Sequence, residues 1–142
     1  MTIQASNDDL KELVSRHEGK RLDMYRDSEG IWTVGIGHNL EAHGISEAVC
    51  TLIFQEDINV AIEECVKLSW FRDLSDVRQA VVVDMVFNMG LPRFSGFRKT
   101  IDFLKNKLYA SAALEMLDSK WARQVGNRAD RLSRMMETGE WP

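Results

Sequence analysis

The stretch HEGKRLDMYRDSEGIWTVGIGH, residues 17–38, decides the fold of this chain and its expected chemistry. A helical pattern of apolar residues leads into it and is expected to end at Glu18, because Gly19 readily adopts the left-handed conformation that follows many helices. The sequence Asp-Ser-Glu-Gly at 27–30 is typical of a turn, and the side chains on both sides of it alternate as they do in strands. We therefore expect a helix end followed by a short β-hairpin.

Two carboxylates, Glu18 and Asp27, fall on irregular backbone within this stretch, one at the helix end and one in the turn. Enzymes that cleave a glycosidic bond usually need one acid to protonate the leaving oxygen and a second carboxylate on the other side of the sugar. Gly35 and Gly37 share one face of the second strand with Thr33, so a ligand can approach the backbone there and the hydroxyl can orient a water. These features predict a cleft in which a sugar chain is cut.

The rest of the chain is predicted to be mostly helical. An N-terminal helix is expected to direct Leu10, Leu13 and Val14 inward, and a long helix is expected over residues 46–67. The apolar run AVVVDMVFNMG at 80–90 predicts a helix buried at the centre of a larger lobe. Shorter helices are expected over residues 97–106, 109–117, 119–125 and 127–137.

These elements predict a mainly helical α+β fold in a single domain of 142 residues, a length that can bury a substantial core. A small hairpin lobe over about residues 19–45 is expected to be joined by the long helix to a helical lobe over about residues 70–142. The N-terminal helix is expected to belong to the helical lobe. Trp70, Trp121 and Trp141 are expected to anchor helix packing rather than to stack on sugars.

The composition is that of a soluble globular protein, with 44% apolar residues, 28% charged residues and a net charge of −4. No apolar run approaches the roughly 18 residues of a membrane helix, and the N-terminus has acids where a secretory signal has basic and apolar residues. We therefore expect a protein of the cytoplasm, without a signal peptide and without stable membrane insertion.

The charges are divided unevenly along the chain. Residues 1–92 hold 8 basic and 16 acidic side chains, whereas residues 93–142 hold 10 basic and 6 acidic ones. The C-terminal part is therefore the one suited to face an anionic polymer, although such charges more often belong to ordinary solvated helix faces. No nucleic-acid partner is expected.

Cys50 and Cys65 are expected to remain unpaired. They lie 15 residues apart in one predicted helix, which separates them by about 22 Å at roughly 1.5 Å per residue. A disulfide requires Cα atoms within roughly 7 Å. Both cysteines are interpreted as small buried hydrophobic residues, and because no cluster of further ligands surrounds them, neither a metal nor a cofactor is expected.

The spacing of Glu18, Asp27 and Thr33, followed by Gly-Ile-Gly-His at 35–38, resembles the signature of the bacteriophage T-four-type lysozymes, glycoside hydrolase family twenty-four. The resemblance extends over nearly the whole chain. Further segments that follow in the family's order are FQED at 54–57, DMVFNMG at 84–90, SGF at 95–97, NRADR at 127–131 and TGEW at 138–141.

The resemblance implies roles for the residues of the opening stretch. Glu18 corresponds to the general acid of the family. Asp27 corresponds to the base, or to the carboxylate that stabilises the oxocarbenium-like transition state, and Thr33 to the residue that helps to place the nucleophilic water. Gly37 is a supporting position beside them. The family resembles the inverting class of glycosidases, in which the second carboxylate activates water.

Other matched positions imply supporting roles. Arg128 matches the arginine that the family pairs with the catalytic glutamate, and a role in holding two lobes together is equally open for it. Asn88 falls where relatives carry a polar amide at the cleft. His38 and Asp57 match an ion pair that joins the end of the hairpin to the connecting helix, so a structural role is expected for both.

The resemblance implies an endolysin, a glycoside hydrolase that cleaves the β-1,4 bond between N-acetylmuramic acid and N-acetylglucosamine in peptidoglycan for host cell lysis. It would wait in the host cytoplasm as a monomer until a holin opens the membrane, although delivery by a virion is an alternative. Two other functions stay open. A lytic transglycosylase needs only one acid, and a non-catalytic wall-binding module needs none; the presence of Asp27 and Thr33 argues against both.

Overall fold

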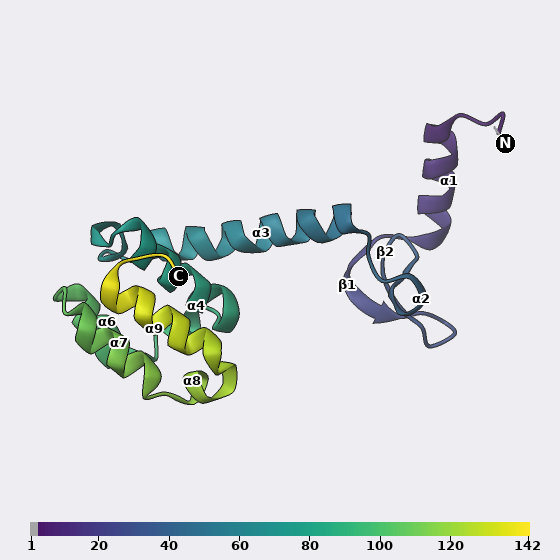
Figure 1. Ribbon diagram of the computed structural model, residues 1–142. Coiled ribbons are helices and arrows are strands. Elements are labelled where there is room, and N and C mark those ends of the chain that lie inside the picture. Colours follow the sequence, from purple (N-terminus) through teal and green to yellow (C-terminus); the bar gives the residue numbers. More distant parts are fainter. Residues whose placement is uncertain (1–2) are drawn as a thin grey trace. The chain divides into compact units, whose positions relative to one another are not determined.

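The computed structural model describes residues 3–142 (Figure 1). The chain divides into two compact units, Met1–Thr51 and Leu52–Pro142. One 20-residue helix, α3 (Glu47–Val66), runs across the boundary between them. The expected long helix over 46–67 is therefore confirmed. The structure contains a small antiparallel sheet and many helices, which confirms the mainly helical α+β fold class.

The N-terminal unit begins with α1 (Asn7–Glu18), whose ends are set by local sequence. The Ser6 hydroxyl accepts a hydrogen bond from the N–H of Asp9 at 3.1 Å, which caps the start of the helix. Gly19, with φ at 74°, donates its N–H to the Ser15 carbonyl at 2.9 Å and ends it. The predicted helix end at Glu18 is confirmed. The expected inward face is not formed within this unit, because α1 buries none of its residues.

A three-stranded antiparallel sheet follows, in the order β1 (Arg21–Arg26), β2 (Trp32–Gly35) and β3 (His38–Asn39). The first two strands form the predicted hairpin, in which Thr33 lies opposite Tyr25. The third strand was not expected, and neither was the short helix α2 (Leu40–His43) that follows it. Both are too short for a periodic sequence pattern to identify them.

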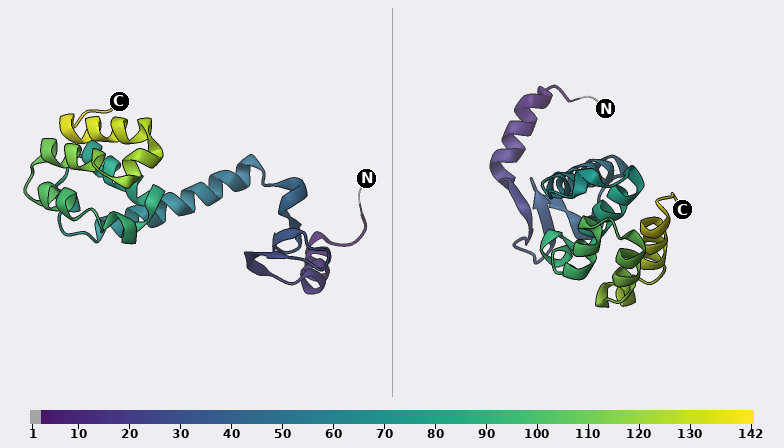
Figure 2. Two further views of the ribbon diagram at one scale, coloured as in Figure 1. Left: turned by 90° about the horizontal axis from the view of Figure 1, so that it is seen from below. Right: turned by 90° about the vertical axis from the view of Figure 1, so that its left-hand side faces the viewer.

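The C-terminal unit contains the predicted helix around the apolar run and the four predicted shorter helices, whose bounds agree with the expected ones to within one residue. They are α4 (Asp76–Met89), α6 (Arg98–Lys105), α7 (Tyr109–Leu117), α8 (Lys120–Val125) and α9 (Asn127–Thr138). A 3-10 turn, η1 (Phe71–Asp73), and the four-residue helix α5 (Leu91–Phe94) were not expected. Figure 2 shows α9, in yellow, running beside α7.

The core of the C-terminal unit is built around α4, as its apolar run predicts. This helix buries six side chains, and Phe94, Met116 and Met136 are each at most 1% exposed beside it. Full burial of a side chain of this size stabilises a fold by about 1.5–3 kcal/mol. Trp70 and Trp121 are buried in the same core, as expected. The expectation is wrong for Trp141, which is 61% exposed.

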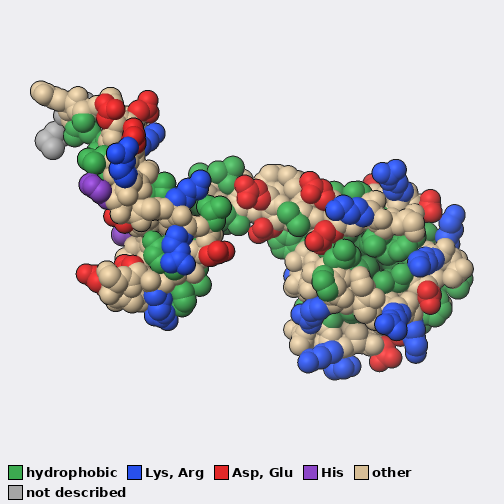
Figure 3. All heavy atoms as spheres, turned by 180° about the vertical axis from the view of Figure 1, so that it is seen from behind, with side chains coloured by type: hydrophobic (Ala, Val, Ile, Leu, Met, Phe, Trp, Pro, Cys, Tyr) green, Lys and Arg blue, Asp and Glu red, His purple; other side chains and the backbone are tan. Residues whose placement is uncertain are grey.

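Charged side chains cover the surface of the C-terminal unit. Figure 3 shows Lys and Arg side chains spread over its visible face and acidic side chains along α3. Among residues 3–142, no helix combines the length and the apolar character that crossing a bilayer requires. Cys50 and Cys65 are both free, as predicted, but only Cys65 is buried.

Candidate active site

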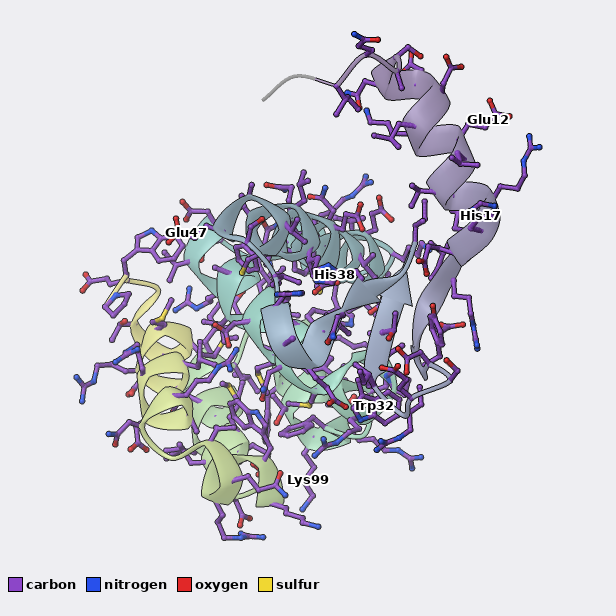
Figure 4. The ribbon with its side chains drawn as sticks, turned by 90° about the vertical axis from the view of Figure 1, so that its right-hand side faces the viewer. Glu12, His17, Trp32, His38, Glu47 and Lys99 are labelled. Atoms are coloured by element: carbon purple, nitrogen blue, oxygen red, sulfur yellow. The ribbon has the colours of Figure 1, made fainter. Side chains whose placement is uncertain are left out.

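The predicted catalytic residues Glu18, Asp27 and Thr33 all lie in the N-terminal unit. Glu18 is the last residue of α1, and the chain passes after Gly19 and Lys20 directly into β1. Figure 4 shows this passage at His17, with Trp32 and His38 on the neighbouring strands. The Glu18 side chain is exposed, so its carboxylate is accessible to a ligand.

Gly37, in the turn between β2 and β3, packs directly against the Glu18 carboxylate. A Cβ atom built at Gly37 would lie 2.5 Å from Oε2 and 2.8 Å from Cδ of Glu18. The backbone there also has a φ of 69°, a conformation that side chains other than glycine adopt only with strain. Glycine is therefore required at this position on two grounds, and it sets how closely the sheet approaches the proposed acid.

The second acid, Asp27, is fixed by the turn that it begins. Its Oδ1 accepts hydrogen bonds from the N–H groups of Glu29 at 2.8 Å and Ile31 at 3.0 Å. The Gly30 N–H donates to the Asp27 carbonyl at 2.9 Å, which closes the predicted turn. Among the described residues, no hydrogen bond engages Oδ2, so one carboxylate oxygen orients the side chain and the other is available for chemistry.

Thr33 is 4% exposed and is the one fully buried residue among residues 3–51. Its hydroxyl donates to the Ile31 carbonyl at 2.9 Å. The same carbonyl accepts the backbone N–H of Asp27 at 2.9 Å, while the N–H of Ile31 donates to the Asp27 carboxylate. The peptide groups of Ile31 thus couple the second acid to the threonine, and the Thr33 oxygen keeps lone pairs that can accept from a water.

The role of Ile31 was not expected, because it acts through its backbone and its side chain gives no sequence signal. Further contacts stiffen the same hairpin. The Arg26 guanidinium lies 4.2 Å from the centre of the Trp32 ring, and the backbone N–H of Trp32 donates to a Glu41 carboxylate oxygen at 3.0 Å. Arg21 lies over Tyr25 in the same manner, at 4.3 Å.

Arg128, at the start of α9, belongs to the C-terminal unit and forms an ion pair there with Asp84 of α4. Its Nε donates to Oδ1 of Asp84 at 2.8 Å, and both side chains are 39% exposed. The sequence did not indicate Asp84 as the partner of Arg128, and its only signal is its place at the head of the DMVFNMG segment. Pairing of Arg128 with Glu18 stays a prediction.

Two of the remaining candidates, Asn88 and His38, have a hydrogen-bond partner within their own unit. The Asn88 carboxamide oxygen accepts a hydrogen bond from the buried Trp121 Nε1 at 2.8 Å, so the packing of this unit determines where its amide group lies. The His38 ring bonds to the Gly44 carbonyl at 2.5 Å, and Asp57 is exposed on α3. The ion pair between His38 and Asp57 stays a prediction.

The N-terminal unit therefore contains an exposed acid at a helix end and an oriented carboxylate linked to a buried hydroxyl. This set of groups is suited to proton transfer and to the activation of water. Among the residues that the structure describes, no group of three or more His, Cys, Asp or Glu side chains is placed to hold a metal ion.

Comparisons with known proteins agree with this chemistry. A family model described as phage lysozyme matches residues 15–137, a range that includes all three predicted catalytic residues. The chain is 31% identical to "Probable T4-type lysozyme 1" of Dictyostelium discoideum, over 92% of this chain and 94% of that protein.

Two phage proteins are also similar to this chain. The endolysin of Salmonella phage P22 is 31% identical over 78% of this chain and 80% of its own length. The pre-baseplate central spike protein Gp5 of Enterobacteria phage T4 is 25% identical over 94% of this chain but only 28% of its own, longer chain.

Proposed function

Because this chain belongs to the phage lysozyme family, we propose that it hydrolyses the β-1,4 bond between N-acetylmuramic acid and N-acetylglucosamine in peptidoglycan. It is a glycoside hydrolase of the lysozyme type. The observation that carries the proposal is the arrangement of Glu18 against Gly37 in the same unit as the oriented carboxylate of Asp27.

The roles follow from what each group has available. Glu18, exposed at the helix end, protonates the leaving oxygen of the glycosidic bond. Asp27 uses its free Oδ2 to take a proton from the attacking water, which is the inverting route. Thr33 accepts a hydrogen bond from that water, since its own proton is engaged by the Ile31 carbonyl. The link through Ile31 keeps the base and the water-holding oxygen in a fixed relation.

The test is digestion of purified peptidoglycan with the wild-type chain and with Glu18→Gln, followed by mass spectrometry of the products. Hydrolysis adds one water to each cut, whereas a lytic transglycosylase yields an anhydro sugar without it. Glu12→Gln is the matched control, because it makes the same change on the same helix and only breaks an exposed ion pair with Arg16. Full activity of Glu18→Gln would overturn the assignment, and binding without any cut would favour a non-catalytic wall-binding module.

Arg128 has a proposed role as well. With one half of its guanidinium held by Asp84, it remains free to donate further N–H groups, so it suits the predicted pairing with the proposed acid. A double-mutant cycle of Glu18→Gln and Arg128→Gln, read from binding of peptidoglycan fragments, measures whether the two residues interact. Strictly additive effects would exclude the pairing.

The likeness to a relative named endolysin supports a role in the lysis of a host cell. In that role the protein waits in the host cytoplasm as a monomer and reaches the wall after a holin opens the membrane. Expression in bacteria with and without a co-expressed holin tests this, because lysis should require both proteins. Lysis by the enzyme alone would contradict holin dependence, and sedimentation equilibrium of the purified chain measures its oligomeric state.

A further inference from the structure

A hollow of about 370 Å³ opens at the C-terminal end of α9, within the C-terminal unit. This volume falls within the range of small-ligand sites, about 300–1,000 Å³. None of the predicted catalytic residues lies in it. Its lining includes Asp130, Arg131, Arg134, Thr138, Glu140 and Trp141.

The aromatic wall of the hollow is Trp141, which is 61% exposed. Trp70 and Trp121 of the same unit are 8% and 3% exposed, so packing places those two inside and leaves this one at the surface. A tryptophan ring offers a large apolar face with a polar N–H at its edge. Such a face is suited to the flat apolar side of a sugar ring, and most of the Trp141 surface is open to solvent.

The segment that carries Trp141 is held in place before any ligand arrives. Gly139 adopts the left-handed conformation, with φ at 71°, and donates its N–H to the Met135 carbonyl at 2.8 Å. The Thr138 hydroxyl donates to the Arg134 carbonyl at 2.9 Å and accepts the Glu140 N–H at 3.2 Å. These bonds fix the turn that leads to the indole.

Arg78 of α4 binds the backbone just before this turn and stabilises it. Its Nε donates to the Met136 carbonyl at 2.7 Å and its Nη2 to the Glu137 carbonyl at 2.9 Å. The Arg78 guanidinium also stacks over the Tyr109 ring at 3.9 Å, which limits its own movement. A preorganised platform binds a ligand at a smaller entropic cost than a mobile tail.

The charges in the hollow specify the chemistry of the ligand. Arg131 and Arg134 are exposed, and no ion pair engages either of them among residues 3–142. They can receive a carboxylate. Asp130 and Glu140 line the same hollow, so a ligand that was only anionic would be repelled in part. A ligand that fits carries a carboxylate together with hydroxyl or amide N–H donors.

We propose that this hollow is a second carbohydrate-binding site, which takes a strand of N-acetylated sugars bearing carboxylates. Trp141 stacks on a sugar ring, Arg131 and Arg134 bind the carboxylate, and the two acids accept the acetamido N–H and hydroxyl donors. The choice of wall glycan as ligand rests on the proposed function, but the site itself needs no catalytic residue. It would hold the enzyme on its insoluble substrate between cuts.

The test is an NMR titration of the full-length Glu18→Gln chain, in which the indole N–H resonance of Trp141 is followed. That resonance is assigned by its absence in Trp141→Phe. One probe is a set of peptide-free glycan strands with their lactyl carboxylates, and the other is a chitooligosaccharide of equal length without carboxylates. We expect a saturable shift with the first probe and at least a tenfold weaker response with the second.

A charge-matched pair of double variants identifies the site. Arg131→Gln with Arg134→Gln should weaken binding about tenfold, equivalent to ~1.4 kcal/mol. Arg93→Gln with Arg123→Gln removes the same charge from exposed positions outside the hollow and should leave the titration unchanged. An indole resonance that does not move, or equal weakening in both double variants, would overturn the proposal. Because the readout is binding at Trp141, it stands even if the wild-type chain cuts no peptidoglycan.

Discussion

The backbone of Gly37 lies against the carboxylate of Glu18, at a distance that leaves no room for a side chain. This contact joins the end of α1 to the turn between β2 and β3. The position of the proposed acid therefore depends on a residue 19 positions further along the chain that has no functional group. Because of this contact, we expect the glycine-rich end of the hairpin to matter for chemistry as well as for folding.

Gly37→Ala should abolish activity against peptidoglycan, because the new Cβ would displace the Glu18 carboxylate. Gly35→Ala is the control, since Gly35 has nearly the same φ, 70°, but nothing within 4 Å of the added atom. Both variants should lose about 1 kcal/mol of stability through backbone strain. Turnover and thermal unfolding separate the two effects. Equal activities of the two variants would show that the contact with Glu18 is not needed.

Asp27→Asn should lose activity while keeping the fold. The asparagine oxygen can still accept the N–H groups of Glu29 and Ile31, so the turn survives, but the amide cannot take a proton from water. Asp27→Ala removes both hydrogen bonds and should cost an additional ~1–2 kcal/mol of unfolding free energy. Urea unfolding and peptidoglycan clearing measure these outcomes. Clearing by Asp27→Asn at the wild-type rate would exclude Asp27 as the base.

The helices could be predicted from the sequence because their ends are set by local groups. Gly19 ends α1 through its own positive φ, and Ser75 and Ser119 cap α4 and α8 through their own hydroxyls. The turn at Asp27 is local in the same sense. Each of these features involves residues at most four positions apart, so the pattern of residue types determines them.

What the sequence could not provide are the contacts between distant residues. The approach of Gly37 to Glu18, the pairing of Arg128 with Asp84 and the exposure of Trp141 depend on how elements pack, and no residue type indicates them. The hydrogen bonds that link Asp27 to Thr33 through Ile31 could not be predicted for another reason, because they use peptide groups that every residue possesses. The roles proposed for Glu18 and Asp27 come from the resemblance of their spacing to that of a known family.

Thr100→Val should stabilise the protein. Thr100 is 1% exposed, and its Oγ1 is the one buried side-chain polar atom without a hydrogen bond among residues 3–142. Removing an unpaired buried hydroxyl relieves a cost of about 1–3 kcal/mol, and valine keeps the branched shape. Thr33→Val is the contrast, because it breaks the hydrogen bond to Ile31 and should destabilise. Urea unfolding of both variants measures the difference, and a destabilised Thr100→Val would show that the hydroxyl has a partner after all.

Cys65 should resist thiol reagents until the C-terminal unit unfolds. Its burial and, to a smaller extent, the negative charge of Glu64 raise the pKa of the thiol from 9.0 to about 11. The reactive thiolate is therefore scarce near neutral pH, and the surrounding core excludes the reagent. Because the folded-state pKa is the higher one, the neutral thiol stabilises the fold below pH 9, and this contribution falls as the pH rises towards 11.

Cys50, exposed on the same helix, supplies the internal comparison. In Cys65→Ser the remaining Cys50 should be labelled by a maleimide within minutes at pH 7. In Cys50→Ser the remaining Cys65 should be labelled only as fast as the C-terminal unit opens, so its rate should rise with urea concentration in parallel with unfolding. Mass spectrometry of quenched samples gives both rates. Rapid labelling of Cys65 in the absence of urea would mean that the helix boundary at Cys65 opens without unfolding of the core around α4.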